Sequence, residues 1–427
     1  MKTVSYRDCK DSGIEWLGTI PDHWEIRRIK DFSQVVRGGS PRPAGNPAFY
    51  EGTIPFLKVG DLTSTEDVYL STHTHTIKEA GLAHTRLVPE NTLLLTNSGA
   101  TLGIPKICTF STTFNDGIAA FIELKKINQV FLYYFLKSQT QWYLNQASFG
   151  QGQPNLNIEI ISHTYFFSPP SFEQKEIAHY LDTKTAQIDR KIDLLTQKAT
   201  LYSNLKQSLI NETVTRGLDK TVPMKDSGIE WIGKVPKHWI FCRHKDNFSL
   251  ITTRCLDPTL LKLGLENIEG KTGQHIPTEN DFDGDGIEFK KNDILFGKLR
   301  PYLAKVYLAE FGGSAVGDIF VYRPKSNTIP KFARYLMLSN RYIDVINSST
   351  VGAKMPRVGV SFIANLPVIT PPIAEQKAIA DYLDTKTAQI DQIIQTINTQ
   401  IERLKELRKT LINDVVTGKI KVVENEH

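Results

Sequence analysis

The chain repeats part of its own sequence, and the order of the repeats is cyclic. Residues 10–24 (KDSGIEWLGTIPDHW) return at residues 225–239 as KDSGIEWIGKVPKHW, with 11 of 15 positions identical. Residues 169–189 return at residues 371–391, with 17 of 21 positions identical. Shared secondary structure alone does not require such identity, so the chain is expected to hold two copies of one unit.

Two unlike segments lie between the repeats, residues 33–168 and residues 249–370, and they differ in sequence and in length. We therefore expect a constant frame that carries two variable inserts. Val214-Thr-Arg-Gly in the first copy matches Val416-Thr-Gly near the end of the chain, and the chain begins with the segment that follows this motif in the second copy. This order predicts that the N-terminus lies beside the C-terminus, in a ring with pseudo-twofold symmetry.

Long amphipathic helices are predicted after Pro169-Pro170 and after Pro371-Pro372, because proline suits the first turn of a helix. Gly217 and Gly418 suit the helix ends. Apolar residues recur every seven positions, which favours a coiled coil, and helices of about 40 residues would be ~60 Å long. We expect the two copies to pair antiparallel. The predicted seam consists of Leu181, Ile188, Leu195, Leu209, Leu383, Ile390, Ile397, Leu404 and Leu411.

Composition sets broad limits on the function. The net charge of +5 and the pI near 8.7 are compatible with a polyanionic partner and do not prove one. The four cysteines (Cys9, Cys108, Cys242 and Cys255) form no CxxC motif, which favours reduced thiols. The sequence has no apolar run near the ~20 residues of a membrane span and no signal-peptide core at its start, so we predict a cytoplasmic protein without membrane contact.

The inserts show short β runs and turns followed by helical spacing, in the same order in both. The fold class is therefore predicted as α+β, with two domains of one mixed α/β fold joined by the two long antiparallel helices. The predicted strands are residues 54–62, 91–96 and 117–124 in the first insert and residues 262–268, 293–297, 305–308 and 318–322 in the second, with helices at 130–144 and 330–346.

Polar, glycine-containing loops recur at matching points of the two inserts. Asn, Gln, Arg and Lys side chains pair with base edges or phosphates, and glycine lets the backbone approach phosphate closely. An ordinary polar turn explains any one loop, whereas the recurrence favours DNA binding by the set. The candidate DNA-binding residues are Arg37, Arg42, Asn97, Thr101, Gln151, Gln153, Asn155, Lys298, Arg300, Lys354 and Arg357.

Catalytic and metal-binding motifs are incomplete in this sequence. The run Asp281-Phe-Asp-Gly-Asp-Gly resembles a calcium loop, but Asn292 stands where a bidentate Glu is needed. His73-Thr-His75 lacks a Cys or acidic ligand in register. The sequence contains neither GxxxxGK[ST] nor a GxGxxG motif after a strand. We therefore predict no catalytic residue and no metal site, and expect a chain that recognises rather than catalyses.

The cyclic frame with two unlike inserts closely resembles the specificity subunit of type I restriction-modification enzymes. The YLDxKxxxID runs at residues 180–189 and 382–391, the DSGIEWxGxxPxHW repeats and the Gln153-Pro-Asn-Leu-Asn loop carry the resemblance, which covers essentially the whole chain. It implies that each insert is a target recognition domain that reads one half of a bipartite double-stranded DNA target. It also implies that the paired helices set the number of unread base pairs between the halves.

The resemblance further implies that the chain has no catalytic activity of its own and acts with partners. Two methyltransferase subunits would methylate adenines with S-adenosylmethionine, and ATP-dependent motor-nuclease restriction subunits would cut unmethylated DNA. This chain would bind no cofactor, and S-adenosylmethionine, ATP and Mg would belong to the partner subunits. Trp16, Trp24, Trp231 and Trp239 in the repeats are assigned to packing within the frame and against those partners.

This interpretation predicts four segments. Residues 1–168 would hold a repeat segment and the first recognition domain, residues 169–217 the central helix, residues 218–370 the second repeat segment and domain, and residues 371–427 the C-terminal helix and tail. The second insert has Lys354-Met-Pro-Arg-Val in place of the QPNLN loop, so equivalent contacts are not carried over. Two alternatives remain: a standalone or unpaired double-domain DNA binder without restriction activity, and a nuclease or methyltransferase with an unrecognised site in one insert.

Overall fold

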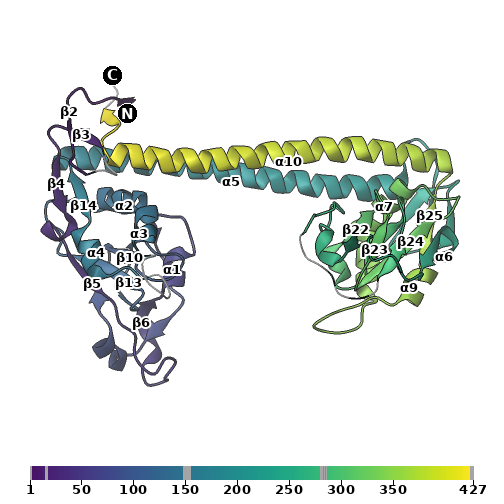
Figure 1. Ribbon diagram of the computed structural model, residues 1–427, viewed down its shortest axis with the longest axis horizontal. Helices are drawn as coiled ribbons and strands as arrows, with labels where there is room; N and C mark the ends of the chain where they lie inside the picture. Colours follow the sequence, from purple (N-terminus) through teal and green to yellow (C-terminus); the bar gives the residue numbers. More distant parts are fainter. Residues whose placement is uncertain are drawn as a thin grey trace. The chain divides into compact units, whose positions relative to one another are not determined.

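The computed structural model describes residues 2–14, 18–147, 155–278, 282, 284 and 286–423. The chain forms two compact units, which we name unit 1 (Met1–Leu194 with Gln400–His427) and unit 2 (Leu195–Thr399). Two long helices, α5 (Ser171–Arg216) and α10 (Ile373–Val416), each contribute residues to both units. The mixed α/β content and the long helices predicted from the sequence are confirmed (Figure 1).

Unit 1 contains two sheets. The strand order is β5-β13-β10-β11-β7 in the larger sheet and β8-β6-β12-β9 in the smaller one. Strand β11 pairs parallel with β7 and β12 pairs parallel with β6, whereas the other pairs are antiparallel. The strands are β5 (Gln34–Arg37), β6 (Tyr50–Leu57), β7 (Tyr69–Leu70), β8 (Thr76–Ile77), β9 (Leu87–Val88), β10 (Thr92–Thr96), β11 (Pro105–Cys108), β12 (Thr112–Phe114) and β13 (Ile118–Ile122).

Unit 2 repeats this topology. Its sheets have the orders β18-β24-β21-β22 and β19-β23-β20, with β19 and β23 parallel, as β6 and β12 are in unit 1. The two inserts therefore share one fold although their sequences differ. The strands are β18 (Phe248–Ile251), β19 (Lys262–Leu263), β20 (Ile287–Phe289), β21 (Ile294–Gly297), β22 (Val306–Leu308), β23 (Gly313–Ala315) and β24 (Ile319–Pro324).

Each insert leaves the frame and returns to it through a two-stranded antiparallel ribbon. The ribbon pairs β4 (Glu25–Arg28) with β14 (Tyr165–Ser168) in unit 1, and β17 (Ile240–Arg243) with β25 (Pro367–Thr370) in unit 2. Each second ribbon strand ends just before a long helix begins. The ribbons thus explain why sequence similarity stops and resumes near residues 33 and 168 in the first copy.

Helices complete the core of each insert, and the predicted helical stretches are in fact pairs of helices. The pairs are α2 (Gln129–Ser138) with α3 (Thr140–Ala147), and α7 (Pro330–Leu338) with α8 (Asn340–Ser348). In unit 2 the break falls at Ser339, whose hydroxyl accepts the Tyr342 N–H and so begins a new helix. Six consecutive residues of α2, Phe131 to Leu136, are buried, which marks α2 as a core helix.

Two predicted strands end earlier than expected, for the same reason in both units. Strand β6 stops at Leu57, and α1 (Val59–Thr63) follows because the Asp61 carboxylate accepts the Lys58 N–H at 2.7 Å. Strand β19 stops at Leu263, and the 3-10 helix η3 (Leu265–Asn267) follows because the Asn267 side chain accepts the Gly264 N–H at 2.9 Å. A side-chain cap three residues ahead thus overrides the β-like apolar pattern.

The two chain ends meet in unit 1, as the cyclic order predicts. Strand β1 (Lys2–Val4) pairs antiparallel with β26 (Lys421–Val423), and both termini lie together in Figure 1. Gly418, at the end of α10, has a φ of +74°, and a Cβ there would lie 2.4 Å from Pro21. Only glycine fits this turn without a shift.

The repeated sequence builds one contact in each unit, which we name the Trp–Glu clasp. In unit 1 the buried Trp24 indole donates from Nε1 to Glu173 Oε2 at 3.1 Å, and His23 Nε2 lies 2.9 Å from the same oxygen. The Tyr6 hydroxyl donates to the other carboxylate oxygen. Burial and this carboxylate raise the pKa of Tyr6 above its ordinary value.

The clasp of unit 2 is the same arrangement one repeat later. Trp239 donates to Glu375 at 2.9 Å, and His238 Nε2 lies 2.6 Å from that carboxylate. Trp24 and Trp239 are fully buried, so their predicted packing role in the frame is confirmed. Trp231 is half-buried, and Trp16 lies outside the described residues.

The glutamine that follows the clasp glutamate in each repeat binds the insert to the long helix. Gln174 accepts the Asn128 N–H at 2.7 Å and donates to the Pro169 carbonyl at 2.8 Å. Gln376 likewise accepts the Ile329 N–H at 2.8 Å and donates to the Pro371 carbonyl at 2.8 Å. The Glu-Gln pair therefore joins three parts of each unit: the frame segment, the long helix and the insert.

The clasp gives a matched stability prediction. Glu173→Ala should lower the free energy of unfolding by about 2–3 kcal/mol, because it leaves the buried Trp24 N–H without an acceptor. Glu375→Ala should cost less, since the Glu375 side chain is 40% exposed and that of Glu173 only 5%. Urea unfolding followed by tryptophan fluorescence measures both variants, with exposed Lys175→Ala as control. Equal losses from the two Glu variants would contradict this account.

Candidate nucleic-acid interface

The polar loops predicted to bind DNA meet at one place in unit 1. The Asn97 N–H donates to the Gly117 carbonyl at 2.9 Å, and the Leu156 N–H donates to the Asn97 carbonyl at 2.7 Å. Ser98 forms an isolated β-bridge with Asn155. Residues 97–103, 115–117 and 155–156 therefore lie together, and we name them the unit 1 loop site.

Unit 2 builds the same arrangement from a different sequence. The Lys298 N–H donates to the Asp318 carbonyl at 2.9 Å, and the Val358 N–H donates to the Lys298 carbonyl at 3.1 Å. Leu299 forms a β-bridge with Arg357. Residues 298–304, 316–318 and 351–358 are the unit 2 loop site. The backbone bonds make Lys298 the counterpart of Asn97, and Arg357 the counterpart of Asn155.

Charge concentrates in the unit 2 loop site. The Asp318 carboxylate accepts from Arg357 Nε at 3.1 Å and from Arg357 Nη2 at 2.8 Å, and Lys298 Nζ lies 3.6 Å from it. The hydrogen bonds from Arg357 hold the pKa of Asp318 below its ordinary value. Arg300 is exposed in a left-handed conformation, and Lys354 is exposed on the 351–358 segment. All four predicted unit 2 residues thus belong to one site.

The unit 1 loop site is largely uncharged. Asn155 and Thr101 are exposed, whereas Asn97 is fully buried and neither polar atom of its side-chain amide has a hydrogen-bond partner in the described part of the chain. A buried amide without a partner costs about 1–3 kcal/mol. Gln151 and Gln153 lie outside the described residues, so their predicted role stays a prediction.

The two arginines predicted near residue 40 lie next to the unit 1 loop site. Arg37 donates from Nε to the Asp116 carbonyl at 2.7 Å, and the Asp116 carboxylate accepts from Ser40 Oγ at 2.7 Å. The Ser40 hydrogen bond is the main cause that lowers the pKa of Asp116. Arg42 is exposed and lines a cavity of about 470 Å³ with Lys58 and other residues of the insert.

Sequence reasoning missed the acidic residues that orient these cations. Asp116 and Asp318 both stand in the turn before an inner strand of the larger sheet, β13 in unit 1 and β24 in unit 2, next to Gly117 and Gly317. An Asp-Gly or Gly-Asp pair before a buried strand was the available signal.

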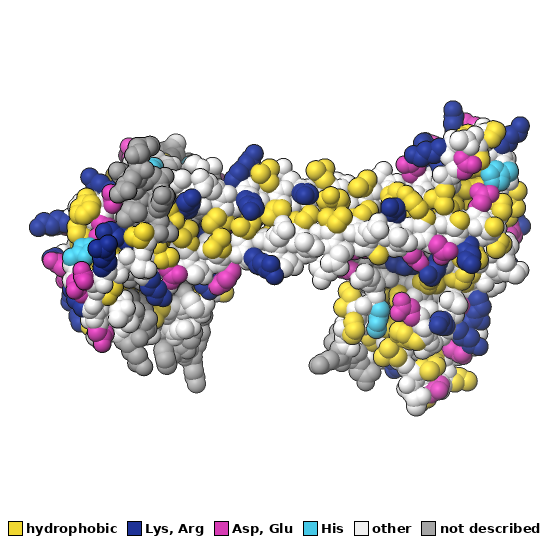
Figure 2. All heavy atoms as spheres, turned by 90° about the horizontal axis from the view of Figure 1, so that it is seen from above, with side chains coloured by type: hydrophobic (Ala, Val, Ile, Leu, Met, Phe, Trp, Pro, Cys, Tyr) yellow, Lys and Arg dark blue, Asp and Glu magenta, His cyan; other side chains and the backbone are white. Residues whose placement is uncertain are grey.

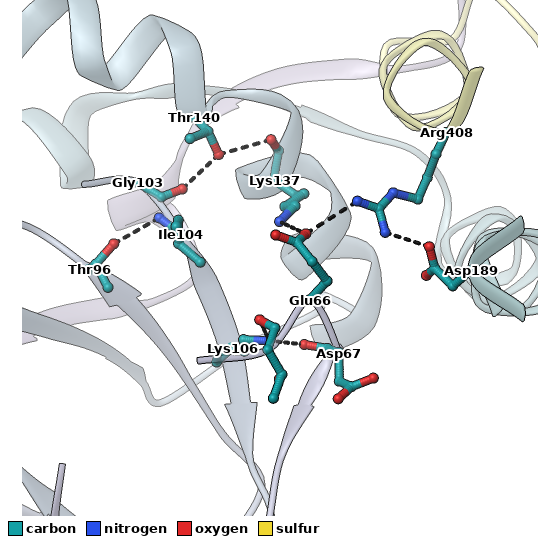
Figure 3. Close-up of polar contacts among 11 residues, drawn as sticks. Glu66, Asp67, Thr96, Gly103, Ile104, Lys106, Lys137, Thr140, Asp189 and Arg408 are labelled. Carbon is teal, nitrogen blue, oxygen red and sulfur yellow. Dashed lines mark hydrogen bonds and ion pairs between the residues drawn. The ribbon is translucent and has the colours of Figure 1, made fainter. Parts of the chain in front are cut away.

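A charged network fastens the first insert to the long helices within unit 1 (Figure 3). The Glu66 carboxylate lies 3.2 Å from both Lys137 Nζ and Arg408 Nη2, and Arg408 Nη1 lies 2.5 Å from Asp189. Although burial acts in the opposite direction, the nearby ammonium of Lys137 and guanidinium of Arg408 lower the pKa of Glu66. The network joins the insert, α5 and α10.

A buried lysine supports this network. Lys106 is 1% exposed and donates to the Thr65 carbonyl at 2.8 Å and to the Asp67 carbonyl, on either side of Glu66. Burial lowers the pKa of Lys106 to about 8. The ammonium holds the loop that presents Glu66 to Arg408.

The long helices are linked at equivalent positions of the two units. In unit 2, Lys206 Nζ lies 2.7 Å from both Asp391 oxygens, and Lys206 and Asp391 stand 202 residues before and after the matching Arg408 and Asp189. Each unit also has a tyrosine bonded to the helix, from Tyr134 to Asp182 and from Tyr335 to Asp384, both at 2.7 Å. In each unit the start of one long helix thus lies beside the end of the other.

The predicted seam residues are all buried or half-buried. Leu181, Leu383, Ile390 and Ile397 are buried, and Ile188, Leu195, Leu209, Leu404 and Leu411 are half-buried. Other apolar side chains of the two helices are exposed: Leu194, Leu201, Leu205, Ile393 and Leu407. Figure 2 shows hydrophobic side chains along the face of the helices that it presents.

Neither a metal cluster nor a membrane span is found in the described part of the chain. Within the described ranges, no group of three or more His, Cys, Asp and Glu side chains is placed to hold a metal ion. The three aspartates of the run at residues 281–286 lie outside those ranges. None of the described helices combines the length and the apolar character needed to cross a membrane.

Two buried asparagines give a matched prediction. Asn97→Leu should raise the free energy of unfolding by about 1–2 kcal/mol, because it removes an unpaired amide. Asn267→Leu should lower it by about 1–3 kcal/mol, since the Asn267 amide is paired with Gly264, Ile276 and Thr278. Denaturant unfolding measures both. Destabilisation by Asn97→Leu would show that its amide has a partner in solution.

The two loop sites on like domains, with long helices common to both units, define a protein with two similar domains on one repeated frame. The family "Type I restriction modification DNA specificity domain" matches residues 21–199 and 281–403. These ranges cover well over half of the chain. The chain belongs to this family, the specificity subunits of type I restriction-modification systems.

Individual relatives agree with this assignment. The chain is 24% identical over 430 residues to the type I restriction enzyme MjaVIII specificity subunit of Methanocaldococcus jannaschii, covering 94% of each chain. It is 24% identical over 323 residues to the EcoDI specificity subunit of Escherichia coli, covering 70% of this chain and 72% of the relative.

Solved structures share the fold. A chain from a study of complex assembly and conformational transition of the type I R-M system has a TM-score of 0.71 at 14% identity, covering 93% of this chain and 98% of that one. The HsdS subunit from Thermoanaerobacter tengcongensis has a TM-score of 0.54 at 13% identity, covering 94% and 98%. At these identities the likeness concerns the fold alone.

Proposed function

We propose that this chain is the noncatalytic DNA-recognition subunit of a type I restriction-modification complex, and that each insert reads one half of a bipartite target. The observation that carries the proposal is the loop site, built with the same backbone bonds in both units but with different side chains. The exposed Thr101 and Asn155 belong to one site, and the exposed Arg300, Lys354 and Arg357 belong to the other. One scaffold with two sets of polar side chains is suited to reading two different sequences.

The long helices are proposed to set the spacing between the two halves. The equivalent contacts of the two units, Arg408 with Asp189 and Lys206 with Asp391, support a pseudo-twofold antiparallel pair. The heptad seam supports a coiled coil along it. A helix pair of fixed length would hold the two recognition domains a fixed number of base pairs apart.

The partners are proposed to be two methyltransferase subunits and the motor-nuclease subunits, acting in the cytoplasm. Leu205 and Leu407 occupy equivalent positions 202 residues apart and are 53% and 54% exposed, respectively. Such apolar side chains on a charged helix surface favour protein contact. Each methyltransferase would flip an adenine out of one half-site, with S-adenosylmethionine, ATP and Mg bound by the partner subunits.

The test of this function is reconstitution. The chain combined with the methyltransferase subunit should methylate adenines at a two-part DNA sequence, whereas the chain alone should transfer no methyl group. Methylated adenines are mapped by sequencing the treated DNA. Methyl transfer by the purified chain alone would refute the noncatalytic role. Binding of two-part DNA without any association with a methyltransferase would favour the standalone binder.

The same assay carries its own specificity control. Exchanging residues 33–168 for the corresponding insert of another specificity subunit should change one half of the methylated sequence and leave the other half and the gap intact. The ribbon of β4 and β14 supplies the junctions, since it closes the insert at its base. A change in both halves would contradict independent reading.

The helix spacing has a separate test. Asp189 contacts Arg408, so in an antiparallel pair Ile192 lies near Lys405. Seven residues inserted after Ile192 and seven inserted before Lys405 therefore keep the seam in register. Seven residues add ~10.5 Å, so the gap should grow by about three base pairs at ~3.4 Å per pair. The gap is read from the methylated sequences. An unchanged gap in a folded variant would refute the helices as the spacer.

A further inference from the structure

The loop site of unit 2 contains a bidentate ion pair between Asp318 and Arg357. Two N–H groups of one edge of the guanidinium, Nε and Nη2, donate to the two carboxylate oxygens at 3.1 and 2.8 Å. The backbone of Arg357 is fixed as well, because it exchanges two hydrogen bonds of 3.0 Å with Val351. The side chain is therefore held at both ends.

This ion pair leaves the outer end of the guanidinium available to a ligand. Arginine has five N–H donors in one plane, and Asp318 takes two of them. Both hydrogens of Nη1 and the second hydrogen of Nη2 remain, and one hydrogen of each nitrogen points outward at the end of the guanidinium. The Arg357 side chain is 48% exposed whereas that of Asp318 is 22% exposed, so the free end is the more accessible part.

Two DNA groups accept a fork of this shape, a phosphate and the O6/N7 edge of guanine. Although Lys298, Arg300 and Lys354 make the whole site positive, the carboxylate beside Arg357 favours guanine at this one fork. Asp318 already carries the negative charge that pairs with Arg357 and Lys298, so a phosphate at the free end would meet a carboxylate a few ångströms away. The guanine edge is neutral and meets no such repulsion.

The counterpart in unit 1 also carries a side chain of a type that pairs with base edges. Asn155 occupies the position of Arg357, because each forms the β-bridge to the segment that follows the central strand. Asparagine pairs with the N6/N7 edge of adenine, as arginine pairs with guanine. Position and side-chain type together indicate a base-reading position.

We propose that Arg357, oriented by Asp318, reads a guanine in the half-site bound by unit 2, and that Asp318 is a positioning residue. This inference rests on the proposed function, since it assigns one residue of the loop site to one type of base. It names a base and a polar pair that determine specificity.

The experiment uses the complex of the chain with its methyltransferase subunit and a DNA library randomised in the unit 2 half-site. The wild-type complex should require G·C at one position. Arg357→Lys keeps the charge but not the fork, so it should lose the preference at that position and bind the target about 5- to 150-fold more weakly. Affinity for unrelated DNA should stay within about twofold, and the preferences at other positions should remain.

Two further variants separate orientation from charge and folding. Asp318→Asn keeps the shape of the side chain but weakens its hydrogen bonds with Arg357. It should therefore reduce the guanine preference at that position without abolishing DNA binding. Arg323→Lys is the matched control, because Arg323 pairs with Asp293 through the same two atoms, Nε at 2.8 Å and Nη2 at 2.7 Å. Asp293 precedes β21, whereas the loop site follows it, so this control should leave every base preference unchanged.

The outcomes distinguish the inference from the function on which it rests. An Arg357→Lys complex that keeps the wild-type guanine preference overturns the inference alone. A second outcome also overturns the inference: Arg357→Ala weakens binding equally on target and unrelated DNA, and the slope of log affinity against log salt concentration falls by about 1. That outcome assigns Arg357 to a phosphate. A wild-type complex without any sequence preference overturns the proposed function.

Discussion

The structure of each unit depends on a carboxylate at the start of a long helix, which is buried at Glu173 and half-buried at Glu375. Glu173 and Glu375 accept the indole N–H of Trp24 and Trp239, and the neighbouring glutamines bind the first N–H groups of the insert helices. An unpaired indole or amide in these places would be costly, so the three parts can pack only when all are present. This constraint explains why the Glu-Gln pair and the tryptophan are repeated while the inserts are not.

The sequence predicted those parts of the fold whose signals are local and repeated. The cyclic order predicted that β1 and β26 would meet, and the Pro-Pro pairs and heptads predicted α5 and α10 to within a few residues. The strands that end at Leu57 and Leu263 were predicted too long. Asp61 and Asn267 each cap a turn that apolar periodicity does not reveal. Side-chain hydrogen bonds over three residues decide such ends.

The sequence singled out four polar residues that meet in the unit 2 loop site, whereas their geometry came only from the structure and their binding of DNA stays a prediction. Lys298, Arg300, Lys354 and Arg357 come from two segments far apart in sequence, and only the strand order of the sheet brings those segments together. Asn97 follows a strand just as Lys298 does, yet it is fully buried. Asp318 was missed because its role is to orient a cation, and residue type alone does not show which acid lies beside which base.

The attachment of the inserts shows how one frame can carry unlike domains. The first insert reaches the helices through Glu66 and Arg408, and the frame holds Lys206 at the position equivalent to Arg408. Both cations are already fixed by an aspartate of the other helix, at Asp189 and Asp391. An acidic loop on either insert would therefore meet a positive charge that is already in place. The second insert uses another contact, from Lys331 to Asp384. The frame thus offers each domain equivalent charged groups, and the two inserts use different ones, whereas the Glu-Gln pair and the tyrosine–aspartate bond are common to both.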